Sequence, residues 1–456
     1  MSTTAVIIGA GPAGMAAAEI LVHAGLHPTI LDEGDQPGGQ IFRKPQAQLQ
    51  RPLEKLYGFD AARARRVNAT FASLRSKIDY RPGTQVWAAG NEILHLIDDS
   101  GSSVQAWTHL IVAPGAMDRI APVRGWTAAG LYSLGGAQIA LKAEAAVIGR
   151  RVIFAGSGPL LYLVAYQYAE AGVDVAAVLE TGHPFAQIAR LPALLSGGRL
   201  FARGLFYMAA LRKRGIPILT GVRLQEVIRD SDDRVTALSF RHRGMEQVES
   251  CDAVALGHGL RSETQLADLL DIEFSFDAVQ RQWLPKTDQD GRSTASNIYL
   301  AGDGLSVRGS EIAEASGRLA ASALLHDIGL PAPSKVERDR RTMRSAARFR
   351  EALEHAFAYP HEEVAALPDD VVVCRCEGLS AGAIRQTVER CGEADINRVK
   401  AFCRVGMGRC QGRLCGAAAA EIVAAASGTT IESVGRMRGQ APIKPIPLAE
   451  LVRSRP

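Results

Sequence analysis

The sequence lacks the features that mark several classes of protein. Its longest early apolar stretch, residues 5–18, contains three glycines and a proline and ends at Glu19, short of the roughly 20 apolar residues that span a membrane. Residues 1–4 carry no Lys or Arg, so we expect no secretory signal. Lys plus Arg (52) barely exceed Asp plus Glu (48), and this near balance gives no reason to expect a nucleic-acid partner. We therefore expect a cytoplasmic protein without a transmembrane segment.

Catalytic side chains of the familiar kinds are also scarce. The ten histidines are scattered, and no Ser, His and Asp set or histidine-rich metal motif stands out, so we expect the histidines to be surface or packing residues. Before residue 374 the only cysteine is Cys251, which we expect to be a small buried hydrophobic residue. An enzyme that works through a redox-active cysteine pair needs two cysteines close in sequence, so that class is excluded.

The 456 residues predict about three domains, and the first begins with a glycine-rich loop. The apolar run 5–8 predicts a strand, and a helix is expected after the loop. Glycines at this junction allow backbone N–H groups to approach a dinucleotide phosphate. Asp32, with Glu33 beside it, ends the next predicted strand, where a carboxylate would accept hydrogen bonds from an adenosine ribose; we favour Asp32. The loop itself comprises Gly9, Gly11, Pro12, Ala13 and Gly14.

The same strand, loop and helix pattern recurs about 150 residues later. Gly156 and Gly158 follow a predicted strand at 151–155, and Glu180 ends the next strand. Leu161 stands where the third glycine of the fingerprint is expected, so a side chain occupies the point of close helix–strand contact. Such a loop could hold another nucleotide or a flavin, bind NADH weakly, or be a structural relic.

Further segments carry a family resemblance. Residues 37–43 follow the second strand, and the runs 108–116 and 297–304 are buried-strand patterns that end in turns. This order resembles the two-dinucleotide-domain flavoproteins, the disulfide reductases and their relatives, over residues 1–325. The resemblance implies that FAD binds the first loop and the residues that follow the strands, namely Gly39, Gln40, Arg43, Ala113, Gly115, Gly302 and Asp303. Pro114 departs from the usual Thr of that family.

The resemblance also bears on the second loop. In that family the second unit binds NAD(P)H, whose hydride reduces the flavin. Because Leu161 replaces a glycine here, we favour loss of NAD(P)H use, although Glu180 could still hold a ribose.

The other six cysteines lie between residues 374 and 415. Two close pairs, C-x-C and C-x4-C, supply the four thiolates that a [2Fe-2S] cluster or a tetrahedral zinc requires. Glycines and arginines around the second pair would offer N–H donors and positive charge to an anionic cluster, which favours the cluster over zinc. The proposed ligands are Cys374, Cys376, Cys410 and Cys415.

Residues 371–430 resemble the bacterioferritin-associated-ferredoxin-like [2Fe-2S] domain, most specifically through Gly406-Met-Gly-Arg-Cys-Gln-Gly412. That resemblance implies that the same four cysteines bind the cluster. Cys391 and Cys403 are left over, and we interpret both as packing residues.

The whole chain resembles the large flavoprotein subunit of heteromeric dye-linked amine dehydrogenases, the group of opine oxidases, hydroxyproline and proline dehydrogenases and cyanide synthase. The resemblance implies that a D-amino-acid-oxidase-like partner subunit oxidises a secondary amine or amino-acid derivative, often beside a small iron–sulfur subunit. This chain would relay the electrons to an acceptor other than oxygen. Through its partners the complex could lie at the inner face of the membrane. The alternatives are a stand-alone NAD(P)H-dependent FAD/iron–sulfur reductase of a soluble acceptor and a non-catalytic scaffold.

These predictions define an α/β fold with two Rossmann-like nucleotide-binding domains and a small helical [2Fe-2S] domain at the C-terminus. We expect a discontinuous FAD domain at 1–120 and 286–330 and a second nucleotide-binding domain at 121–285. A linker helix at 331–370 would lead to the cluster domain at 371–430. Residues 431–456 would form an extended tail.

Overall fold

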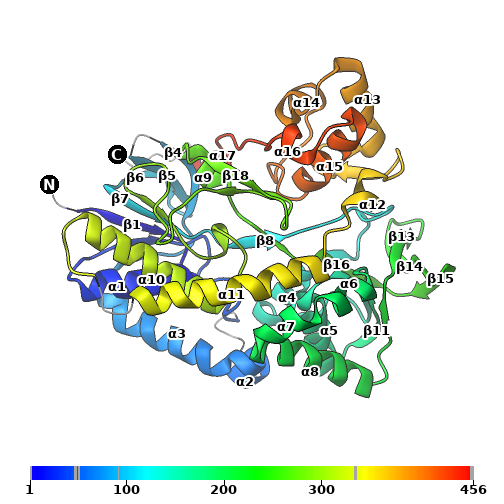
Figure 1. Cartoon of the computed structure of the whole chain (residues 1–456), viewed down its shortest axis with the longest axis horizontal. Coiled ribbons are helices and arrows are strands. Elements are labelled where there is room, and N and C mark those ends of the chain that lie inside the picture. The colour runs from blue at the N-terminus through cyan, green and yellow to red at the C-terminus, as the bar shows by residue number, and fades with distance from the viewer. Residues whose placement is uncertain (1–2, 46–48, 50–51, 91, 333–335, 452–456) are drawn as a thin grey trace. The chain divides into compact units, whose positions relative to one another are not determined.

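The computed structural model describes residues 3–45, 49, 52–90, 92–332 and 336–451. The chain divides into two compact units (Figure 1). Unit 1 combines 1–116, 261–347 and 438–456, whereas unit 2 combines 117–260 and 348–437. In the part of the chain that is described, no helix is both long and apolar enough to cross a bilayer.

The centre of unit 1 is a five-stranded parallel sheet in the order β20-β7-β1-β2-β3. Short apolar runs form these strands because both faces of a parallel sheet are buried, as the fully buried β1 illustrates. Helices α1 and α10 pack together, and their small residues allow the close approach. The sheet strands are β1 (Ala5–Ile8), β2 (Thr29–Leu31), β3 (Asp79–Arg81), β7 (His109–Val112) and β20 (Ile298–Leu300).

The rest of unit 1 surrounds this sheet. Strands β4 (Gln85–Gly90), β5 (Ile93–Asp98) and β6 (Gly101–Ala106) form an antiparallel sheet, and β18 (Phe274–Asp277) pairs with β19 (Gln282–Pro285). The helices are α1 (Pro12–His23), α2 (Leu53–Tyr57), α3 (Ala61–Leu74), α9 (Gln265–Leu269), α10 (Ser310–Asp327) and α17 (Leu448–Leu451), with 3-10 turns η1 (Gly58–Asp60), η2 (Arg75–Lys77) and η4 (Gly302–Gly304).

Unit 2 repeats the plan with a second five-stranded parallel sheet, β12-β11-β10-β16-β9. Its strands are β9 (Leu131–Ser133), β10 (Arg151–Ser157), β11 (Asp174–Glu180), β12 (Ile218–Thr220) and β16 (Ala253–His258). An antiparallel sheet follows, formed by β13 (Arg223–Arg229), β14 (Val235–His242) and β15 (Met245–Ser250). The helices are α4 (Leu134–Ala143), α5 (Pro159–Glu170), α6 (Pro184–Ala189), α7 (Leu191–Leu194) and α8 (Arg199–Lys213), with the 3-10 turn η3 (Leu195–Gly197). The chain thus contains two Rossmann-like folds, as the two glycine loops predict.

Three elements cross the boundary between the units in sequence, and a helical segment completes unit 2. Strands β8 (Ala116–Asp118) and β17 (Leu260–Ser262) begin in one unit and end in the other, and helix α11 (Val336–Ala356) begins in unit 1 and ends in unit 2. The helical segment has its own apolar core, which includes Val373, Ile384 and Ile422. Its elements are α12 (His361–Ala365), β21 (Val372–Cys374), β22 (Leu379–Ser380), α13 (Ala381–Cys391), α14 (Ile396–Cys403), α15 (Gly416–Ser427) and α16 (Ile431–Val434).

The C-terminal tail packs on unit 1 of its own chain. Ile443 is buried in the apolar core beside the β4–β6 sheet, and its N–H donates to the carbonyl of Trp87 at 3.0 Å. Lys444 forms an ion pair with Glu33, and Gln85 Nε2 donates to the carbonyl of Pro445. This part of the tail therefore contributes to the stability of unit 1.

Candidate functional site

The first glycine loop lies at the carboxyl end of β1, where α1 begins. Gly9 has a φ of +98°, and a side chain there would overlap the carbonyl oxygen of Ala113. A side chain at Gly14 would overlap the carbonyl oxygen of Gly9, so this glycine is needed for the close contact between α1 and the strand. The amino end of α1, with Pro12 and Ala13 in its first turn, can therefore approach a phosphate.

The segment after β2 closes on this loop. Gly38 N–H donates to the carbonyl of Ala10 at 2.9 Å, and a Cβ on Gly39 would lie 3.0 Å from the Cα of Gly11. Gly11 itself has an extended backbone, and the nearest atom to a Cβ placed there would be 3.8 Å away. That atom is the Cα of Gly39, so a side chain at Gly11 would make an ordinary contact there rather than an overlap.

Asp32 and Glu33, the two predicted ribose ligands, differ in their surroundings. Burial raises the pKa of Asp32 to about 6, and hydrogen bonds from the N–H groups of Gly34 and Ala10 offset this only in part. Glu33 is exposed and forms an ion pair with Lys444 of the tail. Asp32 is therefore the carboxyl group that faces the glycine loop and that suits the hydroxyls of a ribose.

Two other predicted site residues are brought to the same loop. Ala113, at the end of β7, contacts Gly9 as described above, and Gly302 lies against Ala13, where a Cβ on Gly302 would come within 2.8 Å of the Ala13 side chain. One carboxylate oxygen of Asp303 accepts hydrogen bonds from the N–H groups of Arg308 and Gly309. The carboxyl ends of neighbouring parallel strands β1, β2, β7 and β20 thus converge, which is where open α/β sheets bind ligands.

The remaining residues predicted for this site lie on its rim. Gln40 is exposed and Arg43 is half-buried, and the positive charge of Arg43 slightly lowers the pKa of Asp32. Gly115 has open space on its Cβ side. Arg43 is thus close enough to Asp32 for its charge to act on that carboxyl group.

Sequence reasoning missed the contribution of α10 to this site. Ser316 Oγ accepts a hydrogen bond of 2.8 Å from Gly302 N–H, and a Cβ on Gly317 would overlap the carbonyl oxygen of Ala13. The concentration of Ala, Ser and Gly between Ala313 and Ala323 was the available signal, because close helix packing requires small side chains.

The second glycine loop is closed by its own acidic residue. Glu180 is completely buried, and its carboxylate accepts hydrogen bonds from the N–H groups of Gly182 at 2.7 Å and Gly158 at 3.3 Å. The Tyr162 hydroxyl bonds the same carboxyl group, and burial raises the pKa of Glu180 to about 8. A side chain that is fully enclosed presents no oxygen to a ribose, so the geometry differs from that of Asp32.

Helix α5, which follows the second glycine loop, packs on its sheet differently from α1. Leu161, in the position of the third glycine, is fully buried in the core together with Phe154 and Val164. Ser157 Oγ, in the loop between Gly156 and Gly158, is buried without a hydrogen-bond partner in the structure. The second loop thus keeps the Rossmann backbone, with Leu161 packed into the apolar core where the fingerprint has a glycine.

The four cysteines proposed as ligands lie next to one another in unit 2. Hydrogen bonds connect Cys374 to Cys415, Cys415 to Cys410, and Cys410 to Cys376. In this arrangement, within the described residues, no three His, Cys, Asp or Glu side chains form a group that could hold a metal ion. The thiols instead form an open chain of contacts, with Cys374 and Cys415 buried and Cys376 exposed.

Backbone N–H groups point at these sulfur atoms. Gly406 and Glu377 donate to Cys374, and Gly412 and Leu414 donate to Cys410. A side chain at Gly408 would overlap the Cβ of Cys376. Four thiols with several backbone donors match the chemistry of iron–sulfur ligands, whose anionic sulfurs accept such bonds.

Trp126 holds β21, the strand that ends at Cys374, and sequence reasoning missed it. Its indole N–H donates to the carbonyl of Val372 at 2.5 Å, and the Arg375 guanidinium lies 5.7 Å from its ring. Arg375 is the residue between Cys374 and Cys376. A single buried tryptophan in a loop offers no pattern from which this contact could be predicted.

The other cysteines have different environments. Cys251 is buried, and burial raises its pKa to about 12, so its thiol is inert at neutral pH. Cys403 packs against the core of the helical segment, and Cys391 is half-buried at the end of α13. Neither belongs to the chain of hydrogen-bonded thiols.

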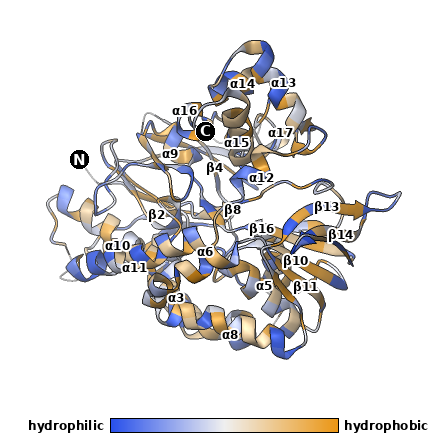
Figure 2. Cartoon of the chain, turned by 45° about the vertical axis from the view of Figure 1, so that its right-hand side comes forward, coloured by the Kyte–Doolittle hydropathy of each residue, from blue (hydrophilic) through white to orange (hydrophobic). Residues whose placement is uncertain are grey.

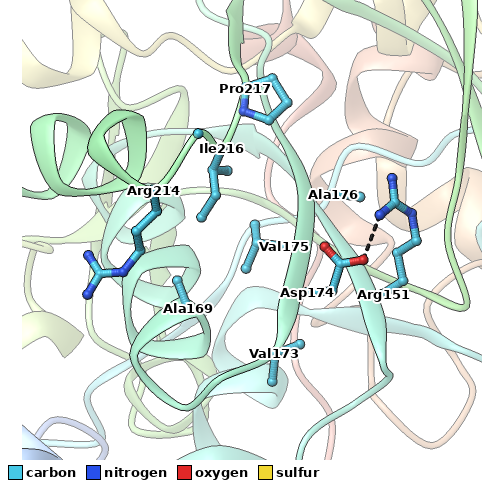
Figure 3. Close-up of a pocket in the computed structure, with 10 residues that line it drawn as sticks. Arg151, Ala169, Val173, Asp174, Val175, Ala176, Arg214, Ile216 and Pro217 are labelled. Atoms are coloured by element: carbon cyan, nitrogen blue, oxygen red, sulfur yellow. Dashed lines mark hydrogen bonds and ion pairs between the residues drawn. The ribbon is translucent and has the colours of Figure 1, made fainter.

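A surface pocket of about 390 Å³ lies at the opposite edge of the second sheet from its glycine loop (Figure 3). Arg151 and Asp174, which begin β10 and β11, form an ion pair of 2.6 Å beside it, and Ile216 and Pro217 lie on its other side. The pocket is therefore separate from both glycine loops.

Together, the two Rossmann-like folds and the glycine loop define a flavoprotein of the two-dinucleotide-domain class. Residues 3–320 match the model of the pyridine nucleotide-disulphide oxidoreductase family, and residues 372–454 match the sarcosine oxidase A3 domain. The chain belongs to the pyridine nucleotide-disulphide oxidoreductase family and is an oxidoreductase. Membership of this flavoprotein family supports FAD as a cofactor.

Curated relatives extend the similarity to the full chain. An opine oxidase subunit of Rhizobium meliloti is 35% identical over 98% of this chain and 86% of its own length. Hydrogen cyanide synthase subunit HcnB of Pseudomonas aeruginosa is 33% identical over 98% of both chains. At these identities and coverages, the chain belongs to the same group as these subunits.

Solved structures confirm the fold. The L-proline dehydrogenase of P. horikoshii superposes with a TM-score of 0.75 at 18% identity, over 98% of this chain and 79% of that one. The thioredoxin reductase of T. acidophilum superposes with a TM-score of 0.53 at 20% identity, over 71% of this chain and 98% of that one. The predicted α/β class with two Rossmann-like domains is therefore confirmed.

Proposed function

We propose that this chain is the FAD- and [2Fe-2S]-containing electron-transfer subunit of a heteromeric dehydrogenase. A partner subunit of the D-amino-acid-oxidase type would oxidise a secondary amine or an amino-acid derivative, with a small iron–sulfur subunit beside it. The full-length similarity to the opine oxidase subunit and to hydrogen cyanide synthase subunit HcnB supports this assignment. We place the complex in the cytoplasm, at the inner face of the membrane.

One contrast carries the proposal: Asp32 keeps part of its side chain exposed beside the first glycine loop, whereas Glu180, beside the second, is completely buried and hydrogen-bonded to that loop. An enzyme that used NAD(P)H would need the second loop to hold the nicotinamide nucleotide. Electrons would therefore reach this chain from another protein rather than from a nucleotide. A second nucleotide or flavin, if bound, would have to use other contacts than the Glu180 carboxylate.

The residues of the first site have separate tasks in this proposal. Gly9, Gly11 and the first turn of α1 would bind the pyrophosphate of FAD through backbone N–H groups. Asp32 would accept the hydroxyl hydrogens of the adenosine ribose, and Asp303 would lie near the ribityl chain or the pyrophosphate. Gly39, Arg43 and Gly115 would border the cofactor. Bound here, FAD would accept electrons in pairs and release them singly.

The four cysteines would hold a [2Fe-2S] cluster, which exchanges single electrons. The backbone donors to Cys374 and Cys410 would stabilise its negative charge, and Arg413, whose Nη1 is 3.4 Å from the Cys410 carbonyl, would add positive charge nearby. Together the two cofactors would convert a two-electron oxidation into single-electron transfer to an acceptor other than oxygen.

The chemistry at the partner would remove a hydride from a C–H bond next to an amine and leave an imine that hydrolyses. Among the described residues we find no side-chain set for that step, and a relay role requires none. The two electrons of the hydride would leave the partner and pass through this chain, while the proton of the hydride and the proton of the amine are both released to solvent.

An anaerobic titration tests the proposal. The purified chain is mixed with NADH or NADPH and then, in complex with its partner subunit, with an opine or a cyclic imino acid, while flavin and cluster absorbance are followed. Bleaching by the amine but by neither nucleotide is expected. Prompt bleaching by NADH or NADPH would instead establish the stand-alone reductase and overturn the relay role.

A further inference from the structure

The segment between β11 and β12 has one sign of charge. Residues 181–225 contain no Asp or Glu, whereas they include six arginines and one lysine. In the whole chain the two signs nearly balance, at 52 basic and 48 acidic residues. This segment, which holds α6, α7 and α8 of unit 2, is therefore a local concentration of positive charge.

The same segment exposes large apolar side chains. Phe185 and Ile188 on α6 are 76% and 65% exposed, and the η3 residue Leu195 is 59% exposed. Leu200 and Leu205 on α8 are 52% and 51% exposed. Isolated apolar residues on a surface are ordinary, but a group within two dozen residues marks a surface that contacts something other than water.

Helix α8 presents apolar rather than polar side chains at several of its solvent-facing positions. Its solvent-facing positions 202, 205, 206 and 209 are Ala, Leu, Phe and Ala, and Arg199, Arg212 and Lys213 lie exposed at its two ends. A helix on an ordinary protein surface presents polar residues to water. Figure 2 shows hydrophobic residues along α8 and hydrophilic residues toward its end. We call the exposed side chains of residues 184–213, taken together, the basic apolar face.

We propose that the basic apolar face binds directly to an anionic membrane surface. Apolar side chains of this kind enter the boundary between headgroups and acyl chains, and arginine binds lipid phosphates through two parallel hydrogen bonds. This inference adds to the proposed function a contact made by this chain's own residues rather than through partner subunits.

Electric charge distinguishes three possible binding partners of this face: a second copy of the chain, a membrane and another protein. A second copy of the chain would bring the same positive charge against this face, and like charges oppose such a contact. The inner leaflet of a membrane is negatively charged and attracts basic residues by about 1 kcal/mol each near the surface. A protein partner would need a surface of complementary carboxylates, and the test below separates that case.

The test is vesicle binding by the purified full-length chain with its cofactors. Sedimentation is compared with vesicles of phosphatidylcholine alone and with vesicles that also contain phosphatidylglycerol. We expect binding only to the anionic vesicles, weakened by added salt because exposed charges are screened over a Debye length of about 10 Å at 0.1 M. Absence of binding to anionic vesicles would overturn the inference.

Two sets of variants locate the contact. The triple variant R199E/R212E/K213E should bind at least about fiftyfold more weakly, since three attractive charges become repulsive. F185S/L205S should lose about tenfold or more, because two apolar side chains no longer enter the lipid. Unchanged binding by both variants would show that this face is not the membrane contact.

Matched controls exclude general effects of charge and polarity. R341E/R344E/R348E makes the same change in net charge with three exposed arginines of α11, and M245S/V248S removes two exposed apolar residues, 63% and 62% exposed, from β15. Both controls should bind vesicles like the unmodified chain. If R199E/R212E/K213E loses a partner subunit while vesicle binding persists, the face binds protein and the lipid assignment is wrong.

Failure here can be told apart from failure of the proposed function. Amine-dependent reduction of a soluble dye by the assembled complex requires no lipid. A chain that relays electrons to the dye but ignores vesicles would refute only the membrane contact, whereas a chain reduced by NADH would refute the relay role regardless of its vesicle binding.

Discussion

The carboxylate of Glu180 accepts a hydrogen bond from the N–H of Gly158 at 3.3 Å, and the side chain is completely enclosed. The acidic residue of the second dinucleotide fold thus binds its own glycine loop. In the first fold, the equivalent Asp32 also accepts a hydrogen bond from its own loop, from the N–H of Ala10, but its side chain is only half-buried. The two loops of similar sequence therefore differ in how far the acidic residue is exposed to a ligand.

Glu180 should make the stability of the protein depend on pH. Its pKa is raised from 4.5 to about 8 in the folded state, so the folded chain binds its proton more tightly than the unfolded chain. The contribution of Glu180 to the free energy of unfolding should therefore be greatest below pH 4.5. It should fall by a few kcal/mol as the pH rises to 8. In thermal melts, E180Q, which imitates the protonated form, should lose less stability than the unmodified chain between pH 5 and pH 9. Parallel melting curves for the two proteins would contradict this burial.

Gly11 should be essential for flavin but not for folding. Its backbone is extended and a Cβ has 3.8 Å to the nearest atom, so G11V can fold while its side chain fills the space of the pyrophosphate. We expect G11V to be purified without flavin, as measured by absorbance after denaturation. G90V is the control, because Gly90 of β4 also has open space at its Cβ. Equal flavin content in G11V and G90V would place the cofactor elsewhere.

The ligand cysteines can be separated from their neighbours by substitution. C410S and C415S should each abolish cluster absorbance and the low-temperature paramagnetic signal of the reduced protein, while flavin remains bound. C403S and C391S should keep the cluster, since neither side chain belongs to the connected thiols. Iron that persists in C410S, or that disappears in C403S, would require a different set of ligands.

Much of this arrangement follows from sequence patterns and some of it does not. The strands before and after each glycine loop form where apolar runs meet turn residues, because backbone hydrogen bonding and burial act locally. The direction of the Glu180 side chain could not be predicted, since it depends on Gly182 and Tyr162 closing around it. Likewise, Trp126 meets Val372 only through the tertiary fold, and no local pattern encodes a contact between residues 246 positions apart.

Trp126 should protect the cluster. W126F keeps an aromatic ring but removes the N–H that bonds the half-buried Val372 carbonyl, at a cost of about 0.5–1.5 kcal/mol. Strand β21, which ends at Cys374, should become more mobile, and the cluster should be lost faster in the presence of an iron chelator. W283F, which changes a tryptophan of β19 in unit 1, is the control. Equal rates of cluster loss in W126F and W283F would contradict a positioning role for Trp126.

Asp32 should oppose stability and favour cofactor binding. Burial raises its pKa from 3.8 to about 6, so between these values the folded, flavin-free chain retains a proton that the unfolded chain has lost. Stability should therefore decrease as the pH rises from 4 to 6 and remain reduced at pH 7, by up to about 3 kcal/mol. Flavin-free D32N should accordingly melt at a higher temperature than the flavin-free unmodified chain at pH 7, and the melting temperatures of the two proteins should converge near pH 4.

The same substitution should weaken FAD binding. D32N loses the charged acceptor of the ribose hydroxyls, so its affinity for FAD should fall about tenfold or more. Equilibrium titration of both flavin-free proteins with FAD measures this difference, and a D32N protein that is both more stable and equally tight in FAD binding would remove Asp32 from the site.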